Sequence, residues 1–125
     1  MRALTIQLVG ESVEDVGDAV VYSLGLSEGP DGSEGFAVIF SLTEPDGEGA
    51  GVCVVIEPGQ WTAYEAVVSS ELVGRTLTLR LTEAGAQQLG GSGVLSLVLD
   101  AGTEAVATLE RGFGRLGIPL VKDPT

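Results

Sequence analysis

The side chains of this sequence that could do chemistry are its carboxylates. The 125 residues include 18 aspartates and glutamates, a single cysteine and no histidine. Without histidine the chain lacks the commonest general base, the Ser–His and Cys–His pairs, and the usual ligand of transition metals. Glu44, Asp46 and Glu48 stand in a Gly/Pro-rich turn, whereas a glycosidase needs two carboxylates held rigidly in a cleft. We therefore predict no enzyme activity and no catalytic, cofactor or metal site.

Two acidic segments resemble ligand-binding loops at first sight. GEGAG (47–51) has a glycine at every second position, but the dinucleotide-binding fingerprint needs a strand, GxGxxG and then a helix. Here the glycines lead into an apolar run, and the acidic neighbours would repel phosphate. The turns 28–34 and 44–48 do not match the spacing of an EF-hand loop, so we expect at most weak Ca²⁺ binding. A hairpin tip is the better interpretation of 47–51.

The charge of the chain is concentrated in its first part. Residues 1–71 hold 13 acidic side chains and one basic one, Arg2, so their balance is 1 − 13 = −12, whereas residues 72–125 hold five of each. This field would repel nucleic acid and anionic membranes and favour a cationic protein partner. A solubility device, or a proteome biased towards acidic residues, is the alternative explanation.

Two aromatic residues lie beside the acidic segments and complete a candidate surface for a basic protein. Trp61 and Tyr64 would serve as anchors with carboxylates around them; the alternative is that both pack on the core. The predicted partner-binding residues are Glu44, Asp46, Glu48, Glu57, Trp61, Tyr64 and Glu65.

The acidic first part, residues 1–71, reads mainly as strands. We predict strands over 4–9, 20–26, 36–42 and 51–57, with an antiparallel hairpin joining the last two. Residues 11–19 are polar and predict a loop, or at most one helical turn capped by Ser12. Residues 61–68 favour a strand continuing towards Ser70, although their alanines and Glu65 also suit a helix.

The stretch 72–119 reads as strand, helix, strand, helix. TLTLRL (76–81) and VLSLVL (94–99) alternate as strands do. Thr82 begins a short helix over 82–89, and a longer helix begins with Thr103 as its cap and stops at Gly117 and Pro119. Glycines 85, 112 and 114 disfavour these helices, so we expect close packing against a neighbour, or fraying of the last turn. Residues 120–125 are expected to form a loose tail.

These elements predict one α+β domain over 1–125, with a mostly antiparallel sheet of about 6–8 strands and two helices in the C-terminal half. Cys53 lies in the apolar run 51–56 and predicts a small buried thiol; a lone cysteine excludes an internal disulfide or a Cys-based zinc site. No apolar run approaches the roughly 20 residues that span a bilayer. Met1-Arg2-Ala3 leads straight into the first strand, so we expect no signal peptide and a cytoplasmic location.

The C-terminal stretch resembles the immunity protein 10 family of bacterial polymorphic-toxin systems. The segments that carry the resemblance are YEAVVSSELVG (64–74), TLTLRL (76–81), EAGAQQLG (83–90), VLSLVLD (94–100) and VATLERGFGRL (106–116). It covers residues 64–116, while residues 1–60 match only as a succession of strands. Departures are Gly112, Gly114 and the acidic turns, and no signature residue carries over as a partner contact.

The resemblance implies a small cytoplasmic antidote that binds a cognate toxin domain and blocks it without turnover. The charge pattern, obtained independently, fits a basic toxin as the partner, with no nucleic-acid or membrane ligand. The alternative is a small structural or regulatory interaction module without a toxin, able to form a homodimer through an open sheet edge.

Overall fold

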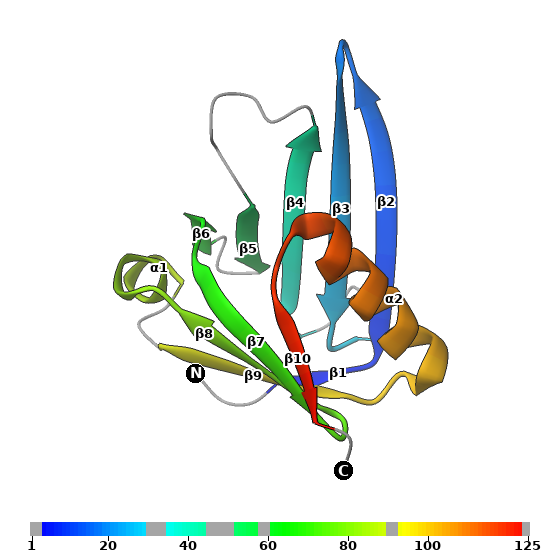
Figure 1. The fold of residues 1–125 in the computed structure, drawn as a ribbon, viewed down its shortest axis with the longest axis vertical. Helices are drawn as coiled ribbons and strands as arrows, with labels where there is room; N and C mark the ends of the chain where they lie inside the picture. Colours follow the sequence, from blue (N-terminus) through cyan, green and yellow to red (C-terminus); the bar gives the residue numbers. More distant parts are fainter. Residues whose placement is uncertain (1–3, 30–34, 45–51, 58–60, 90–92, 124–125) are drawn as a thin grey trace.

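A computed structural model describes residues 4–29, 35–44, 52–57, 61–89 and 93–123, which form two five-stranded sheets and two helices (Figure 1). Sheet A has the order β1 (Leu4–Ile6), β9 (Val94–Leu99), β8 (Thr76–Leu81), β7 (Val67–Val73) and β10 (Leu120–Asp123). Sheet B has the order β2 (Leu8–Val16), β3 (Ala19–Ser27), β4 (Ala37–Glu44), β5 (Cys53–Glu57) and β6 (Trp61–Tyr64). The helices are α1 (Glu83–Gln88) and α2 (Gly102–Leu116).

The α+β class and the two helices in the C-terminal half are confirmed, but the predicted strand count is wrong. The ten described strands exceed the expected 6–8, and they divide between two sheets. Strand pairing is antiparallel except where β1 joins β9 and β10 joins β7, which are parallel.

The extra strands arise where the chain crosses from one sheet to the other. The predicted strand 4–9 breaks at Gln7, so that β1 enters sheet A and β2 enters sheet B. The backbone N–H of Gln7 donates to the carbonyl of Ser27, and that of Asp100 donates to the carbonyl of Ile6. Residues 61–68 are indeed extended, but a bend at Glu65 and Ala66 divides them between β6 and β7.

The loop predicted over 11–19 is wrong, because β2 runs on to Val16 and pairs with β3 along its whole length. Only Gly17 and Asp18 form the turn. Gly17 has a left-handed φ of 64°, while Asp18 does not, which is the pattern of a two-residue type II′ hairpin. The polar side chains that suggested a loop stand on an edge strand, where solvent accepts them.

The core lies between the inner face of sheet B, sheet A and α2. Leu24, Phe40 and Ile56 of sheet B are buried, as are Leu77 and Leu97 of sheet A. In Figure 1 the strands of sheet B stand upright, those of sheet A run diagonally below, and α2 lies across β2–β4. The predicted alternation of 76–81 and 94–99 is confirmed, with the leucines of each strand facing inward.

A small residue allows α2 to approach sheet B closely. Gly112 is buried, and a Cβ placed there would lie 2.7 Å from the Tyr22 Oη and 2.9 Å from a Leu24 methyl. One residue on, the Phe113 ring meets Phe40 edge-on at 5.3 Å between centroids. The close packing predicted from the glycines is therefore confirmed at Gly112, whereas Gly114 faces open space.

Polar side chains stabilise the edge of the contact between α2 and sheet B. The Tyr22 hydroxyl donates to a Glu11 carboxylate oxygen at 2.6 Å, and the Arg111 guanidinium donates to the other at 2.8 Å. The Arg115 guanidinium stacks over the Tyr22 ring at 4.6 Å from its centroid. Burial and the Glu11 carboxylate raise the pKa of Tyr22 to about 12, so the phenol stays protonated and keeps donating.

The predicted helix ends are confirmed except at the start of α2. The Thr82 hydroxyl accepts from the Gly85 N–H at 2.9 Å, and Gly85 is packed against Ala66. Gly117 ends α2 in the left-handed conformation. The predicted Thr103 cap is wrong: α2 begins at Gly102, and the residue at its cap position, Ala101, has no side chain able to accept.

The loose tail predicted over 120–125 is also wrong for its described part. Leu120–Asp123 form β10, which pairs in parallel with Ser70–Val73 of β7. The Ser70 hydroxyl donates to the Pro119 carbonyl, and the Lys122 ammonium pairs with Glu110 at 2.6 Å. Residues 124–125 lie outside the described ranges.

Replacing the two helical glycines by alanine should change stability in opposite directions. Gly112→Ala should lower the free energy of unfolding by about 1 kcal/mol or more, because overpacking exceeds the gain in helix propensity. Gly114→Ala should raise it by about 0.5 kcal/mol, since nothing lies within 4 Å of its Cβ position. Urea denaturation of both variants measures this, and equal shifts would contradict the packing described.

Tyr22→Phe should flatten the acid dependence of stability. The hydrogen bond from Tyr22, followed by that from Arg111, lowers the pKa of Glu11 from 4.5. A carboxylate whose folded pKa is depressed stabilises the protein above its unfolded pKa and loses that contribution as the pH falls through the folded value. Urea midpoints between about pH 3 and 7 should therefore fall less steeply in Tyr22→Phe. Parallel curves would show that the pair contributes nothing.

Candidate functional site

The tip of the β2–β3 hairpin carries a group of exposed carboxylates. Glu14, Asp15 and Asp18 surround the Gly17 turn, and all three are exposed. Figure 1 shows this hairpin rising above the rest of the fold. No described residue forms an ion pair with these carboxylates, whereas Arg111, Lys122 and Arg75 are each paired with an acid. As far as the described residues go, the negative charge at the hairpin tip is not compensated.

Strand register brings further acidic positions to the same end of sheet B. Glu44, the last residue of β4, pairs with Val20 near the hairpin tip. The N–H of Glu65, just after β6, donates to the carbonyl of Val52, just before β5. We call the end of the sheet formed by Glu14, Asp15, Asp18, Glu44 and Glu65 the acidic end of sheet B.

The predicted partner-binding residues do not form one cluster. Tyr64 and Glu65 lie towards the acidic end, where Tyr64 pairs with Cys53. Glu57 and Trp61 lie towards the other end, since Ala37 pairs with Glu57 and Ile56 with Trp61. Three residues of strand, about 10 Å, separate Trp61 from Tyr64. Asp46, Glu48 and the side chain of Glu44 lie outside the described residues.

Both aromatic side chains are on the surface rather than in the core. Tyr64 is 59% exposed and Trp61 37% exposed, on the edge strand β6. They point to opposite faces, because Trp61 shares its face with the buried Ala63. The pKa of Tyr64 is raised, chiefly by the electrostatic effect of the adjacent Cys53 and also by a hydrogen bond to it. Cys53 is half-buried, not fully buried as predicted.

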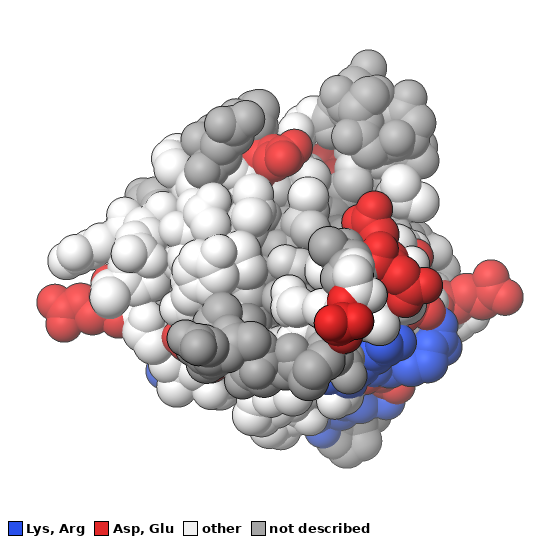
Figure 2. All heavy atoms as spheres, turned by 90° about the horizontal axis from the view of Figure 1, so that it is seen from above, with Lys and Arg blue, Asp and Glu red and all other residues white. Residues whose placement is uncertain are grey.

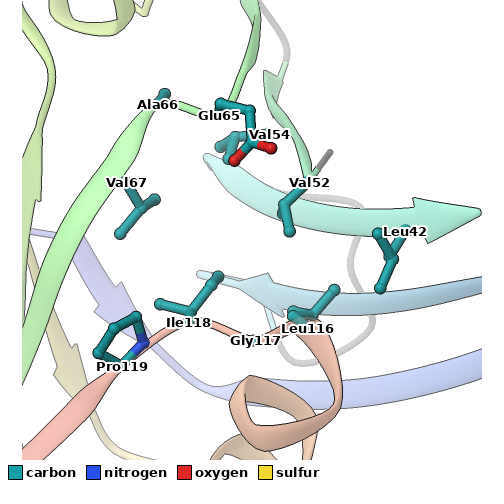
Figure 3. A pocket seen from close by; sticks show the side chains of 10 residues that line it. All are labelled: Leu42, Val52, Val54, Glu65, Ala66, Val67, Leu116, Gly117, Ile118 and Pro119. Carbon is teal, nitrogen blue, oxygen red and sulfur yellow. The ribbon is translucent and has the colours of Figure 1, made fainter. Parts of the chain in front are cut away.

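A cleft of about 280 Å³ opens between the two sheets beside Glu65 (Figure 3). One wall is the inner face of sheet B, with Leu42, Val52 and Val54. The facing walls are Ala66 and Val67, where β7 begins, and residues 116–119, from the last residue of α2 onward. Among the described residues that line the cleft, Glu65 has the one ionisable side chain and the other side chains are apolar.

Glu65 occupies an unusual backbone conformation at the rim of this cleft. Its φ of 53° makes it the one non-glycine residue with positive φ in the described ranges. That conformation costs an L-residue about 1–2 kcal/mol and suits glycine far better. Figure 3 shows its carboxylate beside Val54, on the side of the cleft. The chain thus holds a carboxylate where glycine would relieve strain, a pattern that often marks functional sites.

Viewed from above, charge is unevenly distributed over the molecule. Figure 2 shows most of the blue and red side chains of this face on its right, where basic ones lie beside acidic ones, with further red ones at the upper centre and the left edge. Much of the remaining described surface on this face is uncharged.

Sequence reasoning missed the hairpin acids and the cleft. A usable signal for the hairpin was present, because Gly-Asp at 17–18 between valine-containing segments suits a two-residue turn. The cleft had no signal in the sequence, since its 116–119 wall lies 116 − 67 = 49 residues along the chain from the nearest of the other lining residues.

Within the described residues, no three potential ligands among His, Cys, Asp and Glu are grouped to hold a metal ion. No helix among them has the length and apolar character needed to cross a membrane.

The sequence profile of immunity protein 10 matches residues 7–107, most of the chain. The chain belongs to the immunity protein 10 family. The match begins at residue 7 and so includes most of the acidic part of the chain, whereas the segments that resemble the family lie within 64–116. The match ends at residue 107, within α2. The second half of α2, the 116–119 wall of the cleft and β10 lie beyond it. No curated protein and no solved structure matches the chain.

Replacing the strained Glu65 should reveal a stability cost of the candidate site. Glu65→Gly should raise the free energy of unfolding by about 0.5 kcal/mol, because relief of the left-handed strain exceeds the extra entropy that glycine loses on folding. Glu65→Ala keeps the strain and should leave stability unchanged. Urea denaturation measures both, and a Glu65→Gly variant less stable than Glu65→Ala would contradict the strained backbone.

Proposed function

We propose that this chain is an immunity protein that binds a cognate bacterial toxin domain and blocks it by stoichiometric occlusion, without turnover. Membership of the immunity protein 10 family is the observation that carries the proposal. The toxin is a basic protein of a polymorphic-toxin system, and the complex forms in the cytoplasm.

The acidic end of sheet B is the proposed contact surface. Glu14, Asp15 and Asp18 are exposed and have no described cationic partner, and Glu65 lies at the same end. A toxin that acts on nucleic acid presents a cationic surface to phosphate, and carboxylates placed over it would exclude the substrate. Unlike charges also raise the rate of encounter over the neutral case. Neither nucleic acid nor an anionic membrane is a partner in this proposal.

Tyr64 and Trp61 extend the proposed surface along the edge strand β6. Exposed aromatic rings supply apolar contact area at small entropic loss, which carboxylates cannot do. Glu57 and Trp61 would then lie at the rim of the interface with the toxin, and Tyr64 and Glu65 would lie nearer the centre of that interface. Asp46 and Glu48 follow directly on Glu44 in the chain and belong to the same proposal.

A second candidate is an interaction module that forms a homodimer. It is favoured by the open edge of sheet A, where Val121 of β10 is 62% exposed and Val73 of the adjacent β7 is 41% exposed. Parallel register places both on one face, since Glu71 pairs with Val121 and Val73 with Asp123. Sedimentation equilibrium of the isolated chain distinguishes this candidate: a monomer excludes it.

Co-expression with the product of the neighbouring gene tests the first proposal. The expected result is a one-to-one complex in which toxin activity is lost. Its association rate constant should fall at least about tenfold between roughly 0.02 and 0.5 M salt, because salt screens the attraction between exposed charges. A rate that does not change with salt would remove the electrostatic part of the proposal.

Two sets of charge-removing variants locate the contact surface. Changing Glu14, Asp15 and Asp18 together to Gln, Asn and Asn should slow association several-fold, because three charges that attract the basic toxin are removed. Glu44, Asp46 and Glu48 changed to serine should do the same. The matched control changes Glu71, Glu83 and Glu104, which are exposed elsewhere, to glutamine. Association slowed equally by the control would place the contact surface outside the acidic end.

A further inference from the structure

We propose that the cleft beside Glu65 receives one long basic side chain, arginine or lysine, from the toxin. This inference rests on the proposed function for the identity of the partner, but the recognition itself is testable without the toxin. It goes beyond a general attraction between charges, because it assigns one residue of the partner to one cavity of this chain.

The size of the cleft favours a single side chain. Its volume is about 280 Å³, whereas pockets for drug-sized ligands or cofactors are roughly 300–1,000 Å³. Its walls are valines, leucines and Pro119, with no described group of metal ligands. An aliphatic stem would pack against Val54 and Val67 and leave its charged end at the rim, as long basic side chains do elsewhere in proteins.

The charges around the cleft favour a cation over an anion. The Glu65 carboxylate stands at the rim, and no described residue forms an ion pair with it. Residues 116–119 follow the C-terminal end of α2, where the carbonyls give a helix its negative pole. The nearest base in that turn, Arg115, does not line the cleft, because its guanidinium stacks on Tyr22.

The strain at Glu65 gives an independent reason to assign the carboxylate a role. A chain selected only for stability would carry glycine at φ 53°. The N–H of Glu65 donates to the Val52 carbonyl, which fixes the backbone from which the side chain extends at the rim. Only the side-chain torsions of Glu65 then have to be ordered when its carboxylate pairs with a guanidinium or ammonium group.

Blocked amino acids test the recognition on the full chain without its partner. In ¹H–¹⁵N NMR spectra, N-acetyl-arginine methylamide should shift the amide signals of Glu65, Val67 and Ile118 in a saturable way. N-acetyl-citrulline methylamide, which has nearly the same shape and no charge, should not. Shifts of the same size with the citrulline compound would overturn the proposal. The absence of a saturable shift with both N-acetyl-arginine methylamide and N-acetyl-lysine methylamide would also overturn it.

Two variants and a matched control connect the shifts to the cleft. Glu65→Gln should weaken the arginine response about tenfold or more, because the charge-assisted hydrogen bond is lost. Val52→Phe should fill the cleft and abolish the response while the carboxylate stays, with the remaining spectrum reporting an intact fold. Glu104→Gln, which removes an exposed carboxylate in the first turn of α2, at the other end of that helix from the cleft, should leave it unchanged. Equal effects of Glu65→Gln and Glu104→Gln would overturn the assignment.

The toxin complex then separates this proposal from the proposed function. If the neighbouring gene product binds, Glu65→Gln should increase its dissociation rate about tenfold and Glu104→Gln should not. A wild-type complex that is insensitive to Glu65→Gln would refute the cleft contact and leave the immunity function standing. Failure of the wild-type chain to bind any neighbouring gene product, with the arginine response present, would refute the immunity function alone.

Discussion

The packing of α2 on the inner face of sheet B is the contact on which the rest of the structure depends. It brings the helix backbone at Gly112 to within reach of Tyr22 and Leu24, so that Phe113 can enter the core against Phe40. α2 ends about one turn beyond this contact, at the left-handed Gly117. From that end the chain turns at Gly117, forms one wall of the cleft and joins sheet A as β10. The cleft wall therefore begins on the same face of α2 that makes this contact, because Leu116 lies three residues after Phe113.

The polar groups around this contact also divide the charges of the protein into two kinds. Arg111 is engaged by Glu11 and Arg115 by the Tyr22 ring, so the bases of α2 serve the helix–sheet contact. The carboxylates further along β2, from Glu14 to Asp18, have no such described partner. The net charge of the chain does not distinguish the charges that have a described partner from those that do not. Acidic residues a few positions apart on one hairpin have different roles, because among the described ones only Glu11 has a hydrogen bond to α2.

Much of the scaffold was predictable, and the failures have physical causes. Residues 76–81 and 94–99 alternate clearly because one face of each strand is buried. Residues 4–9 alternate equally well, yet a two-residue period persists across the break at Gln7 and cannot show that the strand changes sheets. The segment 11–16 lacks apolar alternation because an edge strand near a hairpin tip buries little. β10 has four residues, two of them charged, and it pairs with β7, some 50 residues away in the chain.

The sequence by itself determined the chemistry of this protein: the absence of histidine, the excess of acid in residues 1–71 and the segments able to form strands and helices. Those properties belong to single residues and their near neighbours, so they need no knowledge of the fold. The tertiary structure alone decided which acids share one end of a sheet, that Trp61 and Tyr64 are exposed, and that Glu65 stands at the rim of an apolar cleft. Each of these depends on pairings between distant segments, because the burial of a side chain is set by what the rest of the chain places over it.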